Sequence, residues 1–182
     1  MNDREKLLRR VALKCADVVR QISYHRAIEQ KGQLNLNFWI CTYNNTIDMA
    51  VLDWVHLFGN EKDNLHWKKI VNNIDEFRQD LFSTIEMSLE EWIKYWESIK
   101  EYRDKDVAHI EIRPVSNVPK MSTAIKATCF YYSYILFEIK KYGNYSQWPE
   151  DLFDYYQRSF EQSLEIASNA FEATKNIRES VF

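Results

Sequence analysis

Apolar residues recur every three or four positions along most of this chain, and this helical period constrains the fold more than any other feature of the sequence. The clearest run is Ile70, Ile74, Phe77, Leu81 and Ile85. The 182 residues include only three glycines and three prolines, few for a chain that must form many tight turns. No alternating pattern of useful length predicts a β-strand. The sequence therefore predicts an all-α protein, an antiparallel up-and-down bundle of about six helices in a single domain.

The first two helices are expected at about residues 3–30 and 36–58, ended by Gly32 and Gly59. The first of them is long and basic. Residues 1–31 contain eight Lys or Arg against four acids, whereas residues 143–182 contain seven acids against three bases. Such a helix can meet phosphates, can meet the acidic end of a partner, or can simply present a solvated face. The formal net charge of −3 gives no global signal of a nucleic-acid binder.

The third helix is expected to begin at a cap formed by Asp63 or Asn64 and to carry the apolar run through Ile85. Ser88 and Glu91 have the spacing of a capping box, which predicts the start of a fourth helix. These signals place the helix starts before each apolar stripe.

The last two helices are expected at about residues 122–142 and within residues 144–182. The fifth is apolar almost all round, which predicts a central position in the bundle, and Gly143 ends it. Pro149 suits the first position of the sixth.

Three cysteines, Cys15, Cys41 and Cys129, lie far apart among apolar neighbours. They make no CxxC pair and no zinc spacing, so we expect small buried residues in a reducing compartment. The charged start of the chain lacks a signal-peptide core, and the apolar runs are too short to cross a bilayer. These features predict a cytoplasmic protein with no membrane partner.

Arg103 is the anomaly of the fourth helix. It falls on the inward stripe one turn after Ile99, where a guanidinium is costly unless a carboxylate or an anion satisfies it. His109 follows, and an Arg with a His beside a phosphodiester is a plausible minimum for metal-free RNA cleavage. The alternative is a buried ion-pair cluster in which Asp104 or Asp106 neutralises Arg103. On one continuous helix, Arg103 and His109 lie about 120° apart, so either the helix is distorted near Asp106 or two copies complete the site.

Three Asp-x-x-His spacings begin at Asp53, Asp63 and Asp106, and bundles can hold metals with Glu-x-x-His pairs. Every acid here is Asp, and Asp63 is better explained as a helix cap. We therefore expect no metal and no cofactor. His25 has no acidic neighbour and is expected at the surface.

The run from Tyr102 to His109 resembles the signature of HEPN domains, in which Arg is usually followed by Asn, Asp or His, and a His lies four to six residues beyond the Arg. The stretch Leu52–Trp67 and Trp92 resemble the abortive-infection (AbiU-like) branch of that family. The resemblance covers roughly residues 35–175 in helix order.

This resemblance implies an all-α ribonuclease that acts without metal and leaves a 2′,3′-cyclic phosphate. It implies Arg103 as phosphate binder, His109 as acid and base, and Asp104 as the residue that orients them. Lys105 and Asp106 are the expected substrate-binding residues. It also implies RNA as substrate, a homodimer whose two signatures face one cleft, and a cognate antitoxin in a toxin–antitoxin or anti-phage system.

Two other functions fit the same residues. One is a catalytically silent helical module of the same fold that binds a protein or a nucleotide. The other is a metal-dependent bundle enzyme.

Overall fold

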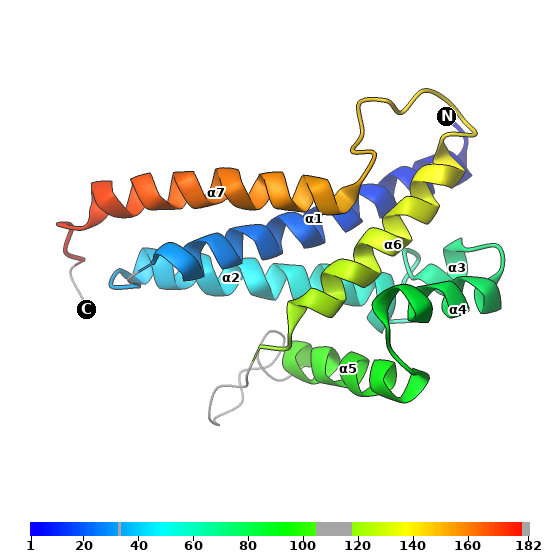
Figure 1. Cartoon of the computed structure of the whole chain (residues 1–182), viewed down its shortest axis with the longest axis horizontal. Helices are drawn as coiled ribbons and strands as arrows, with labels where there is room; N and C mark the ends of the chain where they lie inside the picture. The colour runs from blue at the N-terminus through cyan, green and yellow to red at the C-terminus, as the bar shows by residue number, and fades with distance from the viewer. Residues whose placement is uncertain (33, 105–117, 180–182) are drawn as a thin grey trace.

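The computed structural model describes residues 1–32, 34–104 and 118–179, and this part of the chain is all helical (Figure 1). Residues 55–59 form a wider π-helix, labelled η1. None of the described helices is both long enough and apolar enough to cross a membrane. The elements are α1 (Asp3–Lys31), α2 (Asn37–Trp54), η1 (Val55–Gly59), α3 (Trp67–Ile70), α4 (Ile74–Ile85), α5 (Leu89–Tyr102), α6 (Met121–Ile139) and α7 (Leu152–Thr174).

Helix α1 is the centre of the bundle and packs against α2, α6 and α7. Its start and end agree with the prediction, because the Asn2 side chain accepts the Glu5 N–H and the helix stops at Gly32. The inward stripe of α1 is fully buried: Leu8, Val11, Cys15, Val18, Val19 and Ile22. The predicted apolar period therefore places one face of α1 in the core.

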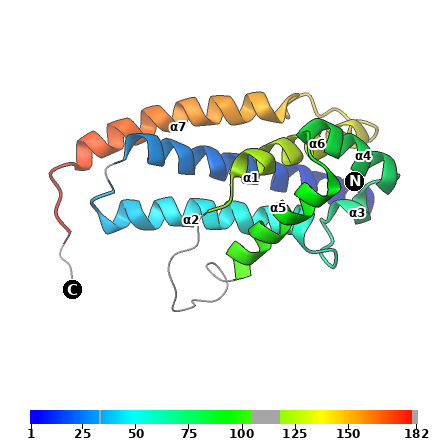
Figure 2. The ribbon, with the colours of Figure 1, turned by 60° about the horizontal axis from the view of Figure 1, so that its bottom comes forward.

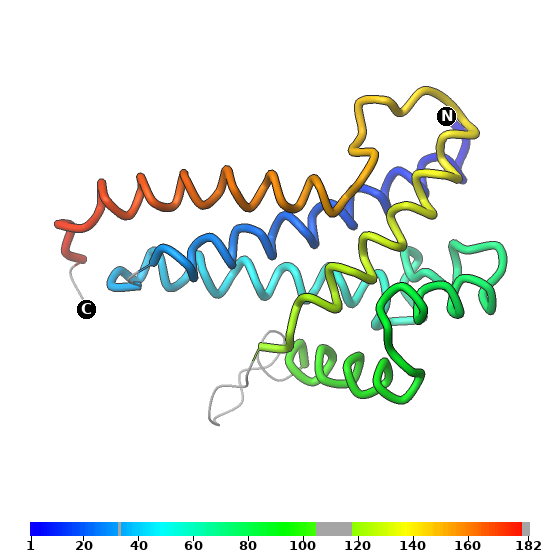
Figure 3. Tube along the Cα trace, in the orientation of Figure 1, coloured from blue at the N-terminus to red at the C-terminus, as the bar shows by residue number. Residues whose placement is uncertain are grey.

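The helices do not simply alternate in direction, and here the up-and-down prediction is wrong. Lys14 pairs with Asp53, near the far end of α2, so α1 and α2 are antiparallel as expected. In contrast, Ser23 meets Ser159 and Arg20 meets Tyr155, so α7 runs parallel to α1. Figures 2 and 3 show these two helices side by side along most of their length. The parallel pair arises because the segment after α6 returns to the start of α1, where Tyr145 donates to Glu5.

The predicted third helix is two elements, and its predicted cap is wrong. A short α3 ends at Ile70, the chain extends at Val71, and α4 begins after Asn73. Asn73 caps α4 by accepting the Glu76 N–H through its side chain. The apolar run crosses this break without interruption because residues on both sides pack on the same core. Periodicity alone therefore missed the break.

The last helix is present as predicted, but its predicted first residue is wrong. Helix α7 begins at Leu152, and its cap is Asp151, whose carboxylate accepts the N–H groups of Phe153 and Asp154. Pro149 lies before the cap, and its carbonyl accepts the Tyr132 hydroxyl hydrogen. Asp151 caps the helix because its carboxylate accepts hydrogen bonds from two backbone N–H groups that would otherwise be unpaired.

Helix α6 packs against α1, α4 and α7, but α1 and not α6 is the centre of the bundle, and α6 ends at Ile139 rather than near residue 142. Cys41, which was expected to be buried, is exposed. Cys15 is buried as predicted, with a thiol pKa raised by that burial, and burial raises the pKa of the Cys129 thiol to about 12. Neither of these two cysteines is therefore a nucleophile near neutral pH.

Candidate functional site

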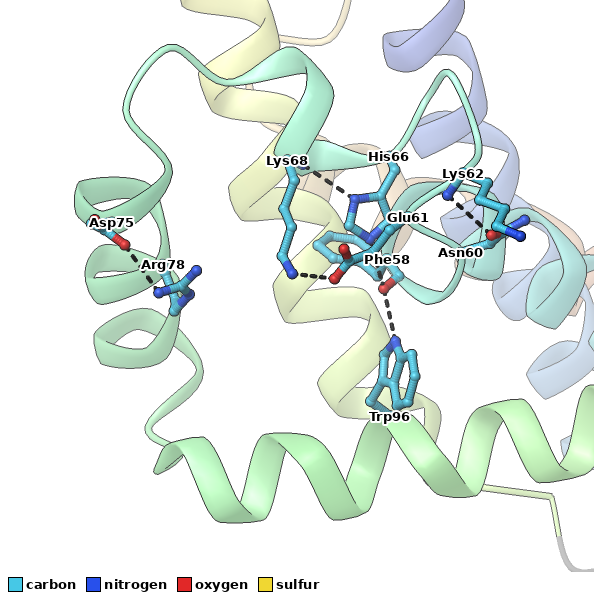
Figure 4. Close-up of polar contacts among 9 residues, drawn as sticks. All are labelled: Phe58, Asn60, Glu61, Lys62, His66, Lys68, Asp75, Arg78 and Trp96. Atoms are coloured by element: carbon cyan, nitrogen blue, oxygen red, sulfur yellow. Dashed lines mark hydrogen bonds and ion pairs between the residues drawn. The ribbon is translucent and has the colours of Figure 1, made fainter.

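The π-helix at the end of α2 leaves the carbonyl of Phe58 open to side chains. Trp96 of α5 donates its indole N–H to this oxygen at 2.8 Å, and the His66 Nε2 lies 3.1 Å from it (Figure 4). One backbone oxygen thus fastens α5 and the loop before α3 to the same turn. Gly59 suits this turn because a Cβ there would lie 2.9 Å from Val55 Cγ1.

An aromatic cluster fills the space between this turn and α5. The ring centroid of Trp54 lies 5.1 Å from that of Phe58 and 5.8 Å from those of Trp92 and Tyr95. These tryptophans and Phe58 are among the residues that carry the AbiU-like resemblance, and here they are core residues. Their role in the described structure is to hold α5, the helix that carries Arg103, against α2.

His66 is a structural residue. It is 1% exposed, its Nε2 donates to the Phe58 carbonyl, and its Nδ1 accepts the Lys68 N–H at 3.3 Å. Burial lowers the pKa of His66 below its ordinary value of 6.5, and the hydrogen bond to Phe58 opposes that shift only in part. Both ring nitrogens are used in the neutral form, so His66 is not an acid or base for a reaction. His25, expected at the surface, is likewise buried, and its Nδ1 lies 3.1 Å from the Tyr43 carbonyl oxygen.

These two histidines make stability depend on pH. Burial also lowers the pKa of His25 below 6.5, so the unfolded chain binds more protons than the folded chain as pH falls through this value. The free energy of unfolding should therefore be highest above pH 6.5 and should decrease toward pH 5. Urea denaturation at pH 7.5 and pH 5.5 measures this. A His25→Gln/His66→Gln variant should show a smaller decrease; an equal decrease in both proteins would contradict the assignment.

Arg103 directly follows α5, and its side chain is mostly buried, as its place on the apolar stripe predicted. The α-helix ends at Tyr102, and the backbone widens to a π-type turn at Arg103 and Asp104. The Arg103 side chain is 23% exposed, and its Nε lies 2.5 Å from Asp104 Oδ1. The geometry of this contact is not that of a hydrogen bond. Nε therefore makes an ion pair with Asp104 but no well-formed hydrogen bond with any described residue. The pairing with Asp104 is one that the ion-pair alternative predicted.

Tyr102 holds this end of α5 in place. It is 8% exposed, and its hydroxyl donates to Asp48 Oδ1 of α2 at 2.8 Å. The buried ring and the hydrogen bond fix the position from which Arg103 projects. Asp48 could not be identified from the sequence, because the two residues are 54 positions apart.

The other predicted site residues, Lys105, Asp106 and His109, lie outside the described residues. The about 120° separation between Arg103 and His109 assumed a regular α-helix. The described α-helix ends at Tyr102, before the interval that this angle spans.

In the two Asp-x-x-His sequences that the structure describes, the Asp side chain does not bind the His three positions later. Asp53 bonds Lys14 at 2.8 Å, and His56 instead meets Asp63, with Nδ1 2.5 Å from Oδ2. Asp63 also accepts the Leu65 N–H, so it caps a turn rather than a helix. Within residues 1–32, 34–104 and 118–179, no three metal-binding side chains come together.

The sequence did not predict a groove lined by cations, although the excess of Lys and Arg in the first helix indicated its basic wall. An open groove of about 1290 Å³ runs between the first half of α1 and the segment from η1 to α3. Its polar lining includes His56, Asp3 and Asp63, together with six cations. These cations are Lys6, Arg9, Arg10, Lys14, Lys62 and Lys69.

Comparisons with protein-family models, with curated proteins and with solved structures found no match for this chain. The signature around Arg103 and its structural setting are therefore the basis for a functional assignment.

Proposed function

We propose that this protein is a HEPN-like, metal-independent endoribonuclease that acts on an RNA phosphodiester with Arg103 and His109, in a toxin–antitoxin or anti-phage setting. The observation that carries the proposal is Arg103 itself. A largely buried guanidinium directly follows α5, and its position is fixed by Tyr102 and by the aromatic cluster. An Arg in such a place is costly unless a carboxylate or another anion satisfies it. The Asp104 carboxylate pairs with Nε without a well-formed hydrogen bond, and in our proposal an RNA phosphate completes the neutralisation.

The chemistry assigned to each group follows from its charge. The planar guanidinium of Arg103 holds two phosphate oxygens through parallel N–H groups and stabilises the charge that develops on them. Asp104 contacts Nε, which orients the guanidinium while its terminal nitrogens face the substrate. His109 takes the proton of the 2′-hydroxyl and returns a proton to the leaving 5′-oxygen. The attack of the 2′-oxygen breaks the P–O5′ bond and leaves a 2′,3′-cyclic phosphate.

The direct test is cleavage without metal. Purified protein is incubated with tRNA and with mRNA in excess EDTA, and the 3′ ends of the products are analysed. The proposal expects products with 2′,3′-cyclic phosphate ends from the wild type and none from His109→Ala. Equal activity in the two proteins would reject His109 as the acid and base. No cleavage of either RNA would favour the silent helical module, in which Asp104 merely neutralises Arg103.

A mixing experiment decides whether one copy or two copies form the site. If Arg103 of one copy works with His109 of another, then mixing Arg103→Ala with His109→Ala protein creates dimers with one intact site. We expect such mixing to restore cleavage that neither variant shows alone. If each site lies within one chain, every mixed dimer lacks an intact site, and the mixture stays inactive. Size-exclusion chromatography of the mixture checks that the copies associate.

A further inference from the structure

We infer that the groove between α1 and the segment from η1 to α3, defined by the lining given above, binds the phosphate backbone of single-stranded RNA. This inference rests on the proposed function for the identity of the polyanion. It assigns a binding surface that is separate from Arg103, which does not line the groove.

The charge of the groove is the first argument. Six cations and two carboxylates line the groove. Two of the cations are neutralised by ion pairs, Lys6 with Asp3 at 2.9 Å and Lys14 with Asp53 at 2.8 Å. Arg10 and Lys62 are exposed and make no side-chain hydrogen bond or ion pair with any residue that the structure describes. Two unpaired cations on facing walls of a groove favour an anion between them.

The spacing of the cations suits a strand rather than a single ion. Lys6, Arg10 and Lys14 are each four residues apart on α1, so they form a row about 12 Å long. A stacked nucleic-acid strand carries one phosphate every ~3.4 Å, so such a row faces several phosphates.

The facing wall is held rigidly, which lowers the cost of binding. Asp63 N–H donates to the Asn60 carbonyl at 2.9 Å, and the Lys62 N–H donates to the Asn60 side chain at 3.1 Å. Figure 4 shows Lys62 on the opposite side of this loop from the Lys68–Glu61 pair. Asp63 also holds His56 through Nδ1, which leaves Nε2 as the ring nitrogen that can meet a ligand. A preformed loop loses little freedom when a ligand arrives.

The rest of the lining distinguishes RNA from a protein partner. The groove contains no Phe, Tyr or Trp, and lysine is its most frequent residue. Protein interfaces are enriched in aromatic residues and depleted in lysine, whereas phosphate contacts come from Lys and Arg. Without aromatic faces for base stacking, the groove should bind RNA through its backbone with little sequence preference.

The test measures binding apart from cleavage. Fluorescence anisotropy follows a labelled 2′-O-methyl oligonucleotide of mixed sequence, which lacks the attacking hydroxyl, at several salt concentrations. The variant Arg10→Ala/Lys62→Ala removes the two unpaired cations. The matched control Lys94→Ala/Arg158→Ala removes two exposed cations outside the groove. For a single strand, each neutralised phosphate contributes about 0.7 to the slope of log K against log salt, so the slope should fall by about 1.4 in the groove variant and hardly at all in the control.

The outcomes separate this inference from the ribonuclease proposal. Equal binding and equal slopes for the two double variants would overturn the groove assignment, as would no binding of the oligonucleotide by the wild type. Preferential binding of poly-glutamate over the oligonucleotide would also overturn it in favour of an acidic protein partner. Groove-dependent binding with no cleavage of 2′-hydroxyl RNA would support the groove and reject the ribonuclease.

Discussion

The Arg103→Ala variant should cleave RNA about 100- to 1000-fold more slowly than the wild type, which is the usual cost of removing one preorganised donor to a developing negative charge. The effect should fall mainly on kcat, because Arg103 is proposed to act most strongly in the transition state. Cleavage of a fluorogenic RNA oligonucleotide in EDTA, followed over a range of substrate concentrations, measures both kcat and KM.

Arg103→Lys distinguishes charge from geometry. Lysine keeps the positive charge but cannot form two parallel N–H bonds, so it should recover only part of the wild-type rate. Arg158→Ala removes an exposed arginine of α7 and should leave the rate unchanged. Circular dichroism must show that all three variants are folded. Wild-type activity in Arg103→Ala would rule out this residue as the phosphate-binding group.

Replacement of Trp54 by alanine should lower the free energy of unfolding by about 3–5 kcal/mol, the cost of deleting a large aromatic side chain from a packed core. Trp54 is 0% exposed and contacts Phe58, Trp92 and Tyr95, which join α2 to η1 and α5. The cavity would therefore weaken the attachment of the helix that carries Arg103. Urea denaturation followed by circular dichroism gives the difference.

Trp54→Phe tests the cause of this effect. The indole N–H of Trp54 is buried without a hydrogen-bond partner among the described residues, so phenylalanine removes an unsatisfied donor while it keeps most apolar contacts. The free energy of unfolding should then fall by only about 1–2 kcal/mol. Phe137→Ala removes a side chain that is 66% exposed and should change stability by less than about 0.5 kcal/mol. Similar decreases for all three variants would contradict a core role for Trp54.

The candidate site could be predicted from sequence only in part. Arg103 was found because a charged residue interrupts an otherwise apolar stripe, and its pairing with Asp104 involves adjacent residues. The contact between Tyr102 and Asp48 joins residues 54 positions apart, and no spacing rule records it. The His56–Asp63 pair was also missed, because Asp53 stands at the helical spacing from His56 in the sequence, whereas in the structure Asp53 pairs with Lys14.

The sequence by itself determined that this chain is helical, where α1 ends and how α5 begins. Helical hydrogen bonds, caps and apolar stripes involve residues within a few positions of one another, so the order of residues records them directly. Only the tertiary structure decided that α7 runs parallel to α1, that Phe58 binds two side chains and that the cations of α1 face Lys62. These features depend on the path of the connecting segments and on which helix faces meet, and side chains distant in sequence come together only after the helices have packed.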